Sequence, residues 1–127
     1  MFHLESFWFR PNESTSDDAG VNIDECILVW IQSEPADEDN RSSVLRKMVK
    51  NIRWLAKKVS ANTIVLHSFA HLGIEKANPD FAEALINEVS ERLITRDFSI
   101  HIVPFGMFNE FKMHVSGPSL GKVFKQF

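Results

Sequence analysis

Asn62–Leu72 reads N-T-I-V-L-H-S-F-A-H-L, and this stretch decides the fold. Its first half is a β-branched apolar run, which is typical of a strand buried in a sheet. The run ends at Ser68 and delivers Phe69-Ala70-His71 into a turn. Because functional sites are commonly built at strand ends, the stretch predicts a central strand with a functional segment at its end.

A second stretch follows the same plan. Phe98–Lys112 reads F-S-I-H-I-V-P-F-G-M-F-N-E-F-K, so an apolar strand ends at the corner Pro104–Gly106. We expect strands at Phe98–Val103 and Phe108–Val115, joined as a hairpin with an irregular corner. The two strand ends carry aromatic residues, a His and a Gly, and they form a pocket if they meet.

Helical and strand patterns alternate along the rest of the chain. Apolar residues of Asn40–Val59 recur at the helical period, which predicts a helix with one buried face. Asn78 and Pro79 suit the N-cap and the first position of a second helix. We expect the acidic connector Glu34–Asp39 to be a solvated loop. Further elements are expected as strands at Phe2–Phe9 and Cys26–Ile31, and as a short terminal helix at Ser119–Phe127.

This order of elements predicts an α/β or α+β fold, in which a mixed sheet of about five strands carries two main helices. With 127 residues, 44% of them hydrophobic, the chain suits one domain over residues 1–127. The single Cys26 excludes an internal disulfide and fits a reducing compartment. We find neither an apolar run of about 20 residues nor a signal-peptide pattern. We therefore expect a cytoplasmic protein with no membrane segment.

Positive charge is concentrated on one predicted helix, although the formal net charge of −3 does not indicate a nucleic-acid-binding protein. Half of the 14 Lys and Arg residues lie within Asn40–Val59, on the face opposite its apolar stripe. Two interpretations stay open, a solvated helix face and a surface that binds a phosphate backbone. The cations of this helix are Arg41, Arg46, Lys47, Lys50, Arg53, Lys57 and Lys58.

Common catalytic motifs are absent from the sequence. His67 and His71 are four residues apart, but they lie on a strand that runs into a turn, and the chain has neither CxxC nor HExxH. We therefore expect no metal. No glycine-rich phosphate loop and no G-x-S-x-G occur, and we expect no cofactor. Cys26 lies in an apolar strand, where a thiol is normally inert. His71 keeps two interpretations, a structural histidine and a site residue.

Two motifs and the helix between them resemble the N-terminal editing domain of archaeal threonyl-tRNA synthetases. The motifs are Ser68–Leu72, followed by a Pro-led helix, and Pro104–Gly106, followed by Phe111-Lys112. The family pattern reads roughly Y-P-F-A-H-L at the first place and P-F-G-Y-Y-K-x-F-K at the second. The resemblance spans most of Cys26–Gly117. It implies a D-aminoacyl-tRNA deacylase-like fold, a homodimer, and hydrolysis of serine mischarged onto threonine tRNA.

Editing of this kind has a physical motive. Serine lacks one methyl group of threonine, which is worth only about 1–3 kcal/mol of discrimination in a binding pocket. A second, hydrolytic site removes the errors, and it needs an activated water and donors for the oxyanion. In the family, backbone groups of the first motif and the 2′-hydroxyl of the terminal adenosine carry much of this chemistry. We expect no aminoacylation core in these 127 residues.

The resemblance also assigns roles to individual positions. The predicted catalytic positions are His71, Asn109, which replaces the family Lys, and Lys122, at the approximate position of a family Glu. The predicted substrate-binding positions are His67, which replaces the family Tyr, and Phe69, Ala70, Phe105, Gly106 and Phe108. The predicted contacts with the tRNA backbone are Arg46, Lys50, Arg53 and Lys57.

Two functions from different classes remain open. The first is an editing hydrolase, which the retained first motif supports. The second is a catalytically degenerate paralogue that acts as a tRNA-binding or protein-assembly module, which the changes at Asn109 and Lys122 support. The expected partners are the 3′ aminoacyl end of tRNA, a second copy of the chain, and a threonyl-tRNA synthetase catalytic subunit.

Overall fold

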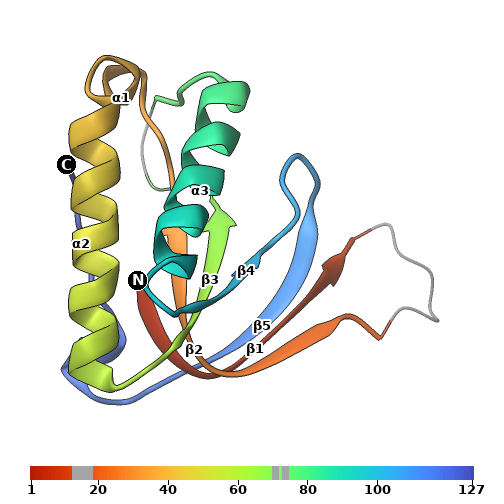
Figure 1. Cartoon of the computed structure of the whole chain (residues 1–127). Helices are drawn as coiled ribbons and strands as arrows, with labels where there is room; N and C mark the ends of the chain where they lie inside the picture. Colours follow the sequence, from red (N-terminus) through yellow and green to blue (C-terminus); the bar gives the residue numbers. More distant parts are fainter. Residues whose placement is uncertain (13–18, 70–71, 73–74) are drawn as a thin grey trace.

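A computed structural model describes residues 1–12, 19–69, 72 and 75–127. Strands and helices alternate in the predicted order, with one further short helix before the long one (Figure 1). The elements are β1 (Phe2–Pro11), β2 (Val21–Ile31), α1 (Pro35–Asp39), α2 (Arg41–Val59), β3 (Thr63–Ser68), α3 (Pro79–Ile94), β4 (Ser99–Ile102), β5 (Asn109–Val115) and the 3-10 helix η1 (Ser119–Gly121).

The five strands form one mixed sheet in the order β4-β3-β2-β1-β5. β3 is parallel to both β2 and β4, because α2 and α3 carry the chain back across the sheet between these strands. β1 is antiparallel to β2 and to β5. The predicted fold class, an α+β domain with a mixed five-stranded sheet, is confirmed.

β4 and β5 do not form the expected hairpin. They lie at opposite edges of the sheet, and β5 pairs with β1 instead. The register places Phe111 opposite Phe9 and Met113 opposite Phe7, so the alternating apolar residues of β5 extend the apolar face of β1. This packing of β5 on β1 depends on contacts between residues far apart in the sequence, so local sequence patterns do not reveal it.

The sheet has an apolar core on each face. α2 and α3 cover one face (Figure 1), where Ile27, Val29, Ile64 and Leu66 pack against buried residues of both helices. The other face carries no helix among the described elements, and its core is built by the strands themselves. The buried residues of this second core are Leu4, Phe7, Phe9, Ile23, Cys26, Leu28, Val65 and Val103.

The acidic connector is a short helix and not a loop. α1 begins with Pro35 at its first position, where the fixed φ of proline suits a helix. The backbone N–H of Glu34 donates to Asp37 Oδ2 at 2.8 Å, and acidic residues in the first turn complement the helix dipole. The capping chemistry of this stretch thus outweighs its polar composition.

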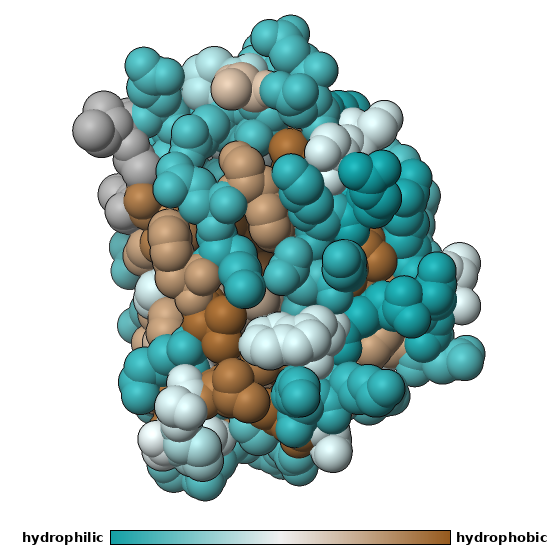
Figure 2. Space-filling model, turned by 90° about the vertical axis from the view of Figure 1, so that its left-hand side faces the viewer, coloured by the Kyte–Doolittle hydropathy of each residue, from teal (hydrophilic) through white to brown (hydrophobic). Residues whose placement is uncertain are grey.

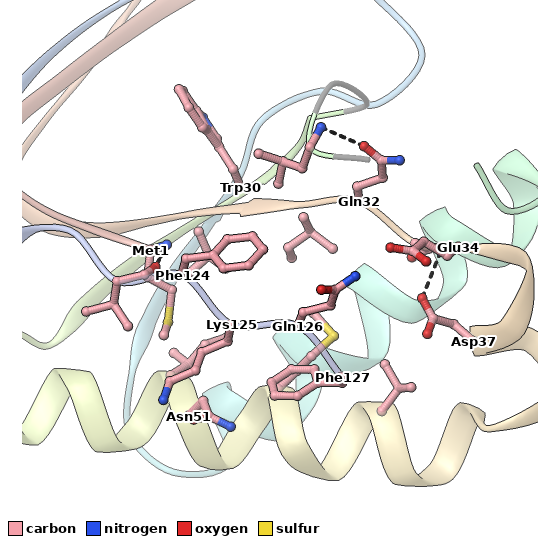
Figure 3. A pocket seen from close by; sticks show the side chains of 18 of the residues that line it. Met1, Trp30, Gln32, Glu34, Asp37, Asn51, Phe124, Lys125, Gln126 and Phe127 are labelled. Carbon is pink, nitrogen blue, oxygen red and sulfur yellow. Dashed lines mark hydrogen bonds between the residues drawn. The ribbon is translucent and has the colours of Figure 1, made fainter. Parts of the chain in front are cut away.

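The expected terminal helix is reduced to η1. After it, the chain returns to the start of β1, where Phe2 forms an isolated antiparallel bridge with Lys122. The backbone N–H of Val123 donates to the Met1 carbonyl at 2.8 Å. The tail, residues 122–127, then runs alongside α2 (Figure 3), where Lys125 Nζ lies over the ring of Trp54. Among the described residues, no helix combines the length and apolarity needed to cross a bilayer.

Candidate functional site

The end of β3 is held against the end of β2. The backbone N–H of Phe69 donates to the Ile31 carbonyl at 2.9 Å, which continues the parallel pairing by one residue. The ring of Phe69 stacks on that of Trp30, with 4.1 Å between the ring centroids and 6° between the planes. These contacts fix the direction in which the chain leaves the strand. Ala70 and His71, the next two predicted site residues, lie outside the described residues.

Gln32 holds the chain beyond these two residues. Its side-chain Oε1 accepts from the backbone N–H of Leu72 at 2.7 Å, and its Nε2 donates to the Glu75 carbonyl at 2.8 Å. Figure 3 shows Gln32 just after β2, and a dashed line marks the hydrogen bond that its side-chain amide accepts. One amide group therefore fixes the chain just after His71. Sequence reasoning missed this residue, and its one signal was a polar side chain directly after the apolar run of β2.

His67 lies in an aromatic cluster on the face of the sheet that carries no helix. Its ring centroid is 5.5 Å from that of Phe111 and 6.1 Å from that of Phe69. Burial lowers the pKa of His67 below its ordinary value of 6.5, because the charged imidazolium would lose hydration there. The ring is therefore neutral at neutral pH. Its Nδ1 has no hydrogen-bond partner in the part of the chain that the structure describes.

A cavity of about 400 Å³ lies between the end of β2, the first half of α2 and the tail. In Figure 3, Trp30 and Gln32 point to one side of β2, while Phe124, Gln126 and Phe127 lie on the other side, toward α2. Its lining is mainly apolar with a few polar groups, as is common for small-molecule sites. The face around it shows a band of hydrophobic side chains between hydrophilic margins (Figure 2).

The cavity connects two of the predicted regions. Leu72, the residue after His71, lines it together with Lys122. The last residue of the first motif and the predicted position of the family Glu thus line one cavity. The residue at that position is a lysine, so this edge of the cavity is cationic and not acidic.

The corner after β4 forms a second, separate region. Phe105 packs partly buried against the helix-side core, and Gly106 takes a left-handed φ of 81° that favours glycine. Phe108 points outward and is 87% exposed. The Asn109 amide Nδ2 donates to the carbonyls of Met107 at 3.3 Å and Pro104 at 3.5 Å. Asn109 therefore closes its own turn.

Two predicted catalytic positions do not meet within one chain. Asn109 pairs with Pro11 at one end of β1, and Lys122 bridges to Phe2 at the other end. Ten residues of strand span about 30 Å. A site that uses both positions would require a second copy of the chain.

The predicted tRNA-backbone residues lie together on α2. Arg46, Lys50, Arg53 and Lys57 are all exposed, on a helix that has no acidic residue. Residues from other sides of the same helix, Val44, Met48, Asn51 and Ile52, line the cavity. α2 thus carries both a wall of the cavity and a cationic surface.

Cys26 takes no part in this site. It is fully buried in β2, in the core of the helix-free face. Burial, and then the negative charge of Asp24, raise the pKa of the Cys26 thiol to about 11. The thiol therefore stays protonated at neutral pH and is a poor nucleophile, as its position in an apolar strand predicts.

Comparison with solved structures supports the fold. The chain aligns with a protein described as c-Myc DNA Unwinding Element Binding Protein at a TM-score of 0.60, over 94% of this chain and 91% of that chain. The two sequences are 15% identical, so the likeness concerns the fold alone. It is consistent with the predicted D-aminoacyl-tRNA deacylase-like architecture.

Comparison with curated proteins finds threonine–tRNA ligases of archaea. The chain is 29% identical to that of Thermococcus sibiricus and 32% identical to that of Thermococcus onnurineus, in both cases over 90% of this chain and 18% of the ligase. It is 30% identical to that of Methanosphaera stadtmanae, over 97% of this chain and 21% of the ligase. The chain spans about a fifth of the length of these relatives.

A family model gives the broadest match. The model for the archaea-specific editing domain of threonyl-tRNA synthetase aligns with residues 1–127. The resemblance carried by the two motifs is therefore confirmed over the whole chain. Together with the α+β architecture, this match shows that the chain belongs to the archaea-specific editing-domain family of threonyl-tRNA synthetase.

Proposed function

We propose that this chain is one editing-type domain that hydrolyses the aminoacyl ester of mischarged tRNA, with serine on threonine tRNA as its substrate. One observation carries the proposal: Leu72, the last residue of the first motif, lines a cavity of about 400 Å³ together with Lys122. Such a volume suits an aminoacyl group with part of its nucleotide. We expect the domain to act in the cytoplasm, where tRNA is charged.

The anchored segment supplies the polar groups for the reaction. Phe69 is fixed by its stack on Trp30, and the backbone N–H of Leu72 is fixed by the amide of Gln32. Groups that are already in place stabilise a developing oxyanion without reorganisation. His71 is the side chain of this segment that can exchange a proton near neutral pH.

The RNA supplies the group that orients the attacking water, which neither Asn109 nor Lys122 supplies. Asn109 is occupied by its own turn, and Lys122 cannot act as a carboxylate base. The family resemblance gives the 2′-hydroxyl of the terminal adenosine a part in orienting the attacking water. Lys122, at the edge of the cavity, is placed to contact the anionic backbone near that nucleotide.

Deacylation of defined substrates tests the proposal. The purified chain should hydrolyse seryl-tRNA(Thr) faster than the buffer does, and faster than it hydrolyses threonyl-tRNA(Thr). Gln32→Leu should lower the single-turnover rate about 10- to 100-fold, because Leu72 and Glu75 lose their hydrogen bonds to Gln32. Gln32→Glu, which keeps the acceptor for Leu72, should retain more of the rate.

Two measurements show whether a Gln32 variant slows the reaction by displacing the bound segment or by unfolding the protein. Tm and tRNA affinity of the Gln32 variants should stay near those of the wild type, while the chemical step slows. A wild-type rate equal to that of the buffer at high enzyme concentration would rule out hydrolysis by this chain.

The second candidate function is a tRNA-binding or protein-assembly module without catalysis. The placement of Asn109 and Lys122 favours it, because neither side chain supplies the chemistry of the residue it replaces. Under this function, the wild type binds tRNA without hydrolysis, and the double variant N109K/K122E gains deacylation only if the pocket is otherwise intact. An active wild type excludes this candidate.

The helix-free face of the sheet is the surface on which we expect a protein partner. Half-buried apolar side chains gather there around its buried core, among them Phe2, Trp30, Phe111, Met113 and Val115. We propose that a second copy of the chain covers this face in a homodimer, and that a threonyl-tRNA synthetase catalytic subunit is a further partner. Dimerisation would also allow Asn109 of one copy to approach the Lys122 region of the other.

A further inference from the structure

A second hollow, distinct from the cavity, lies between α2 and α3. Its volume is about 230 Å³, and we call it the basic groove. Arg46, Lys50 and Arg53 line it from α2, and Arg92 and Arg96 line it from the C-terminal end of α3 and the turn that follows. The remaining lining residues are Val49 and Thr95.

Helix geometry explains why these cations converge. Arg46, Lys50 and Arg53 are four and three residues apart, so they project from one face of α2. Arg92 and Arg96 are likewise one turn apart, and α3 lies beside α2 on the same face of the sheet (Figure 1). Two rows of cations therefore meet along the line where the two helices pack.

Carboxylates balance only one end of the basic groove. Glu88 pairs with Arg92 at 3.5 Å and also with Arg41. Within residues 1–12, 19–69, 72 and 75–127, no ion pair involves the other four cations, which are Arg46, Lys50, Arg53 and Arg96. Like charges gathered in this way repel one another, and a bound anion relieves that repulsion.

The donors of the basic groove suit phosphate. Guanidinium groups present paired N–H donors that match two oxygens of one phosphate, and Lys50 adds a mobile point charge. The Thr95 hydroxyl donates to the Arg92 carbonyl at 2.7 Å, so it does not compete with the guanidinium groups as a donor. Val49, 8% exposed, gives the basic groove an apolar floor.

We propose that the basic groove binds a phosphate group of an RNA backbone. The choice of RNA rests on the proposed function, which supplies tRNA as the polyanion. Geometry supports it, because α2 lines the cavity with Val44 and Met48 and the basic groove with Arg46 and Lys50. The two hollows are thus about one helix diameter, 10–12 Å, apart. An RNA whose 3′ end occupies the cavity can lay its backbone across α2.

Charge-neutralising pairs test the site. R53Q/R96Q removes two cations of the basic groove, while K47Q/K58Q removes two exposed cations of α2 that line neither hollow. Binding of an acceptor-stem RNA ending in CCA is followed by fluorescence anisotropy across a salt series. R53Q/R96Q should weaken binding about tenfold or more and reduce the slope of log K against log salt by about 1 to 2.

The control decides whether the basic groove is a discrete site. K47Q/K58Q should change the affinity less than threefold, since it alters only the general field. Equal losses in the two variants would overturn the proposal in favour of a diffuse basic surface. Because all four substituted side chains are exposed, both variants should fold, which circular dichroism verifies. The single variant R96Q should give about half of the effect on the slope.

A small anion is the alternative source of the phosphate. NMR signals of the arginine side chains are recorded with inorganic pyrophosphate and then with the RNA. Displacement of pyrophosphate by RNA, with the same arginine signals shifted, supports the RNA assignment. Pyrophosphate that binds at micromolar concentration and is not displaced by RNA overturns it.

A deacylation assay with seryl-tRNA(Thr) distinguishes failure of the proposed RNA site from failure of the proposed hydrolysis. If R53Q/R96Q binds RNA like the wild type while the wild type hydrolyses the ester, the proposed RNA site in the basic groove is wrong and the proposed function stands. If the wild type does not hydrolyse the ester but R53Q/R96Q loses more RNA binding than K47Q/K58Q does, the proposed RNA site stands and the proposed hydrolysis is wrong.

Discussion

Single residues at the ends of the strands determine how the first motif is held. Gln32 does so with two hydrogen bonds to backbone atoms across a gap of 40 residues and more. Its neighbour Trp30 adds a ring stack on Phe69. Both contacts join β2 to the chain after β3, and the one local sign of them in the sequence is the polar residue that follows the apolar run of β2. The motif itself could be predicted from sequence, but its supports could not.

Acid sensitivity of folding is a prediction at the same scale. The pKa of His67 is lowered by burial, so the unfolded chain takes up a proton near pH 6.5 that the folded chain takes up only at lower pH. The contribution of His67 is therefore fully present above about pH 6.5 and is lost as the pH falls through the lower folded value. Urea unfolding at about pH 7.5 and about pH 5.5 should show a larger loss of stability in the wild type than in His67→Gln.

His101 provides the matched control for this prediction. It lies on β4 and is exposed, in contrast to His67, which is 7% exposed. His101→Gln should lose as much stability on acidification as the wild type does. If His67→Gln is just as acid-sensitive as the wild type, the titration of His67 does not govern this response.

At the scale of elements, α1 and η1 depart most from the sequence expectations. A polar, acidic stretch forms α1 because proline and aspartate satisfy its first turn. The segment after β5 forms only one turn, because the tail leaves it to pair with the start of β1. α2, by contrast, is long and strongly periodic, so its apolar stripe predicted it with bounds close to those observed. Asn78 and Pro79 correctly predicted where α3 begins.

Gly121 controls how the tail leaves η1, and it gives a prediction for this element. A Cβ atom at Gly121 would overlap the Ser116 carbonyl oxygen, which belongs to the backbone and cannot move aside cheaply. Gly121→Ala should therefore reduce the free energy of unfolding by about 1–3 kcal/mol. It should also disturb the cavity edge that Lys122 forms. Urea denaturation measures the first effect.

Gly117 lies in the same connection and has open space where a Cβ would be placed. Gly117→Ala should therefore change stability by no more than about 0.5 kcal/mol. Equal destabilisation by the two substitutions would show that the close approach at Ser116 is not what requires glycine at position 121.

At the scale of the whole molecule, the two faces of the sheet differ in what covers them. α2 and α3 cover one face, and the described residues place no helix on the other. Light scattering coupled to size exclusion should therefore report a dimer for the wild type. Met113→Lys, on the helix-free face, should shift the protein toward monomer, because a buried charge at an interface is costly. Ile94→Lys, on α3 and 55% exposed, should leave the mass unchanged.

Local patterns predicted the fold class better than they predicted the arrangement of the site. The central strand, its parallel neighbour and both long helices follow from periodicity and capping. The partner of β5 does not, because its apolar alternation suits either edge of the sheet equally well. That single choice places Asn109 and Lys122 at opposite ends of β1, so motif positions that resemble one catalytic set are far apart within one chain.

The separation of charge between α2 and the rest of the molecule has a kinetic consequence. One helix carries half of the 14 basic residues and none of the 17 acidic ones, so positive charge is concentrated on α2 although the net charge is −3. Near a polyanion, such a molecule is turned before contact so that α2 leads. Orientation during diffusion raises the rate of productive encounters and lowers the rate of docking in the wrong pose, even though the net negative charge repels the polyanion.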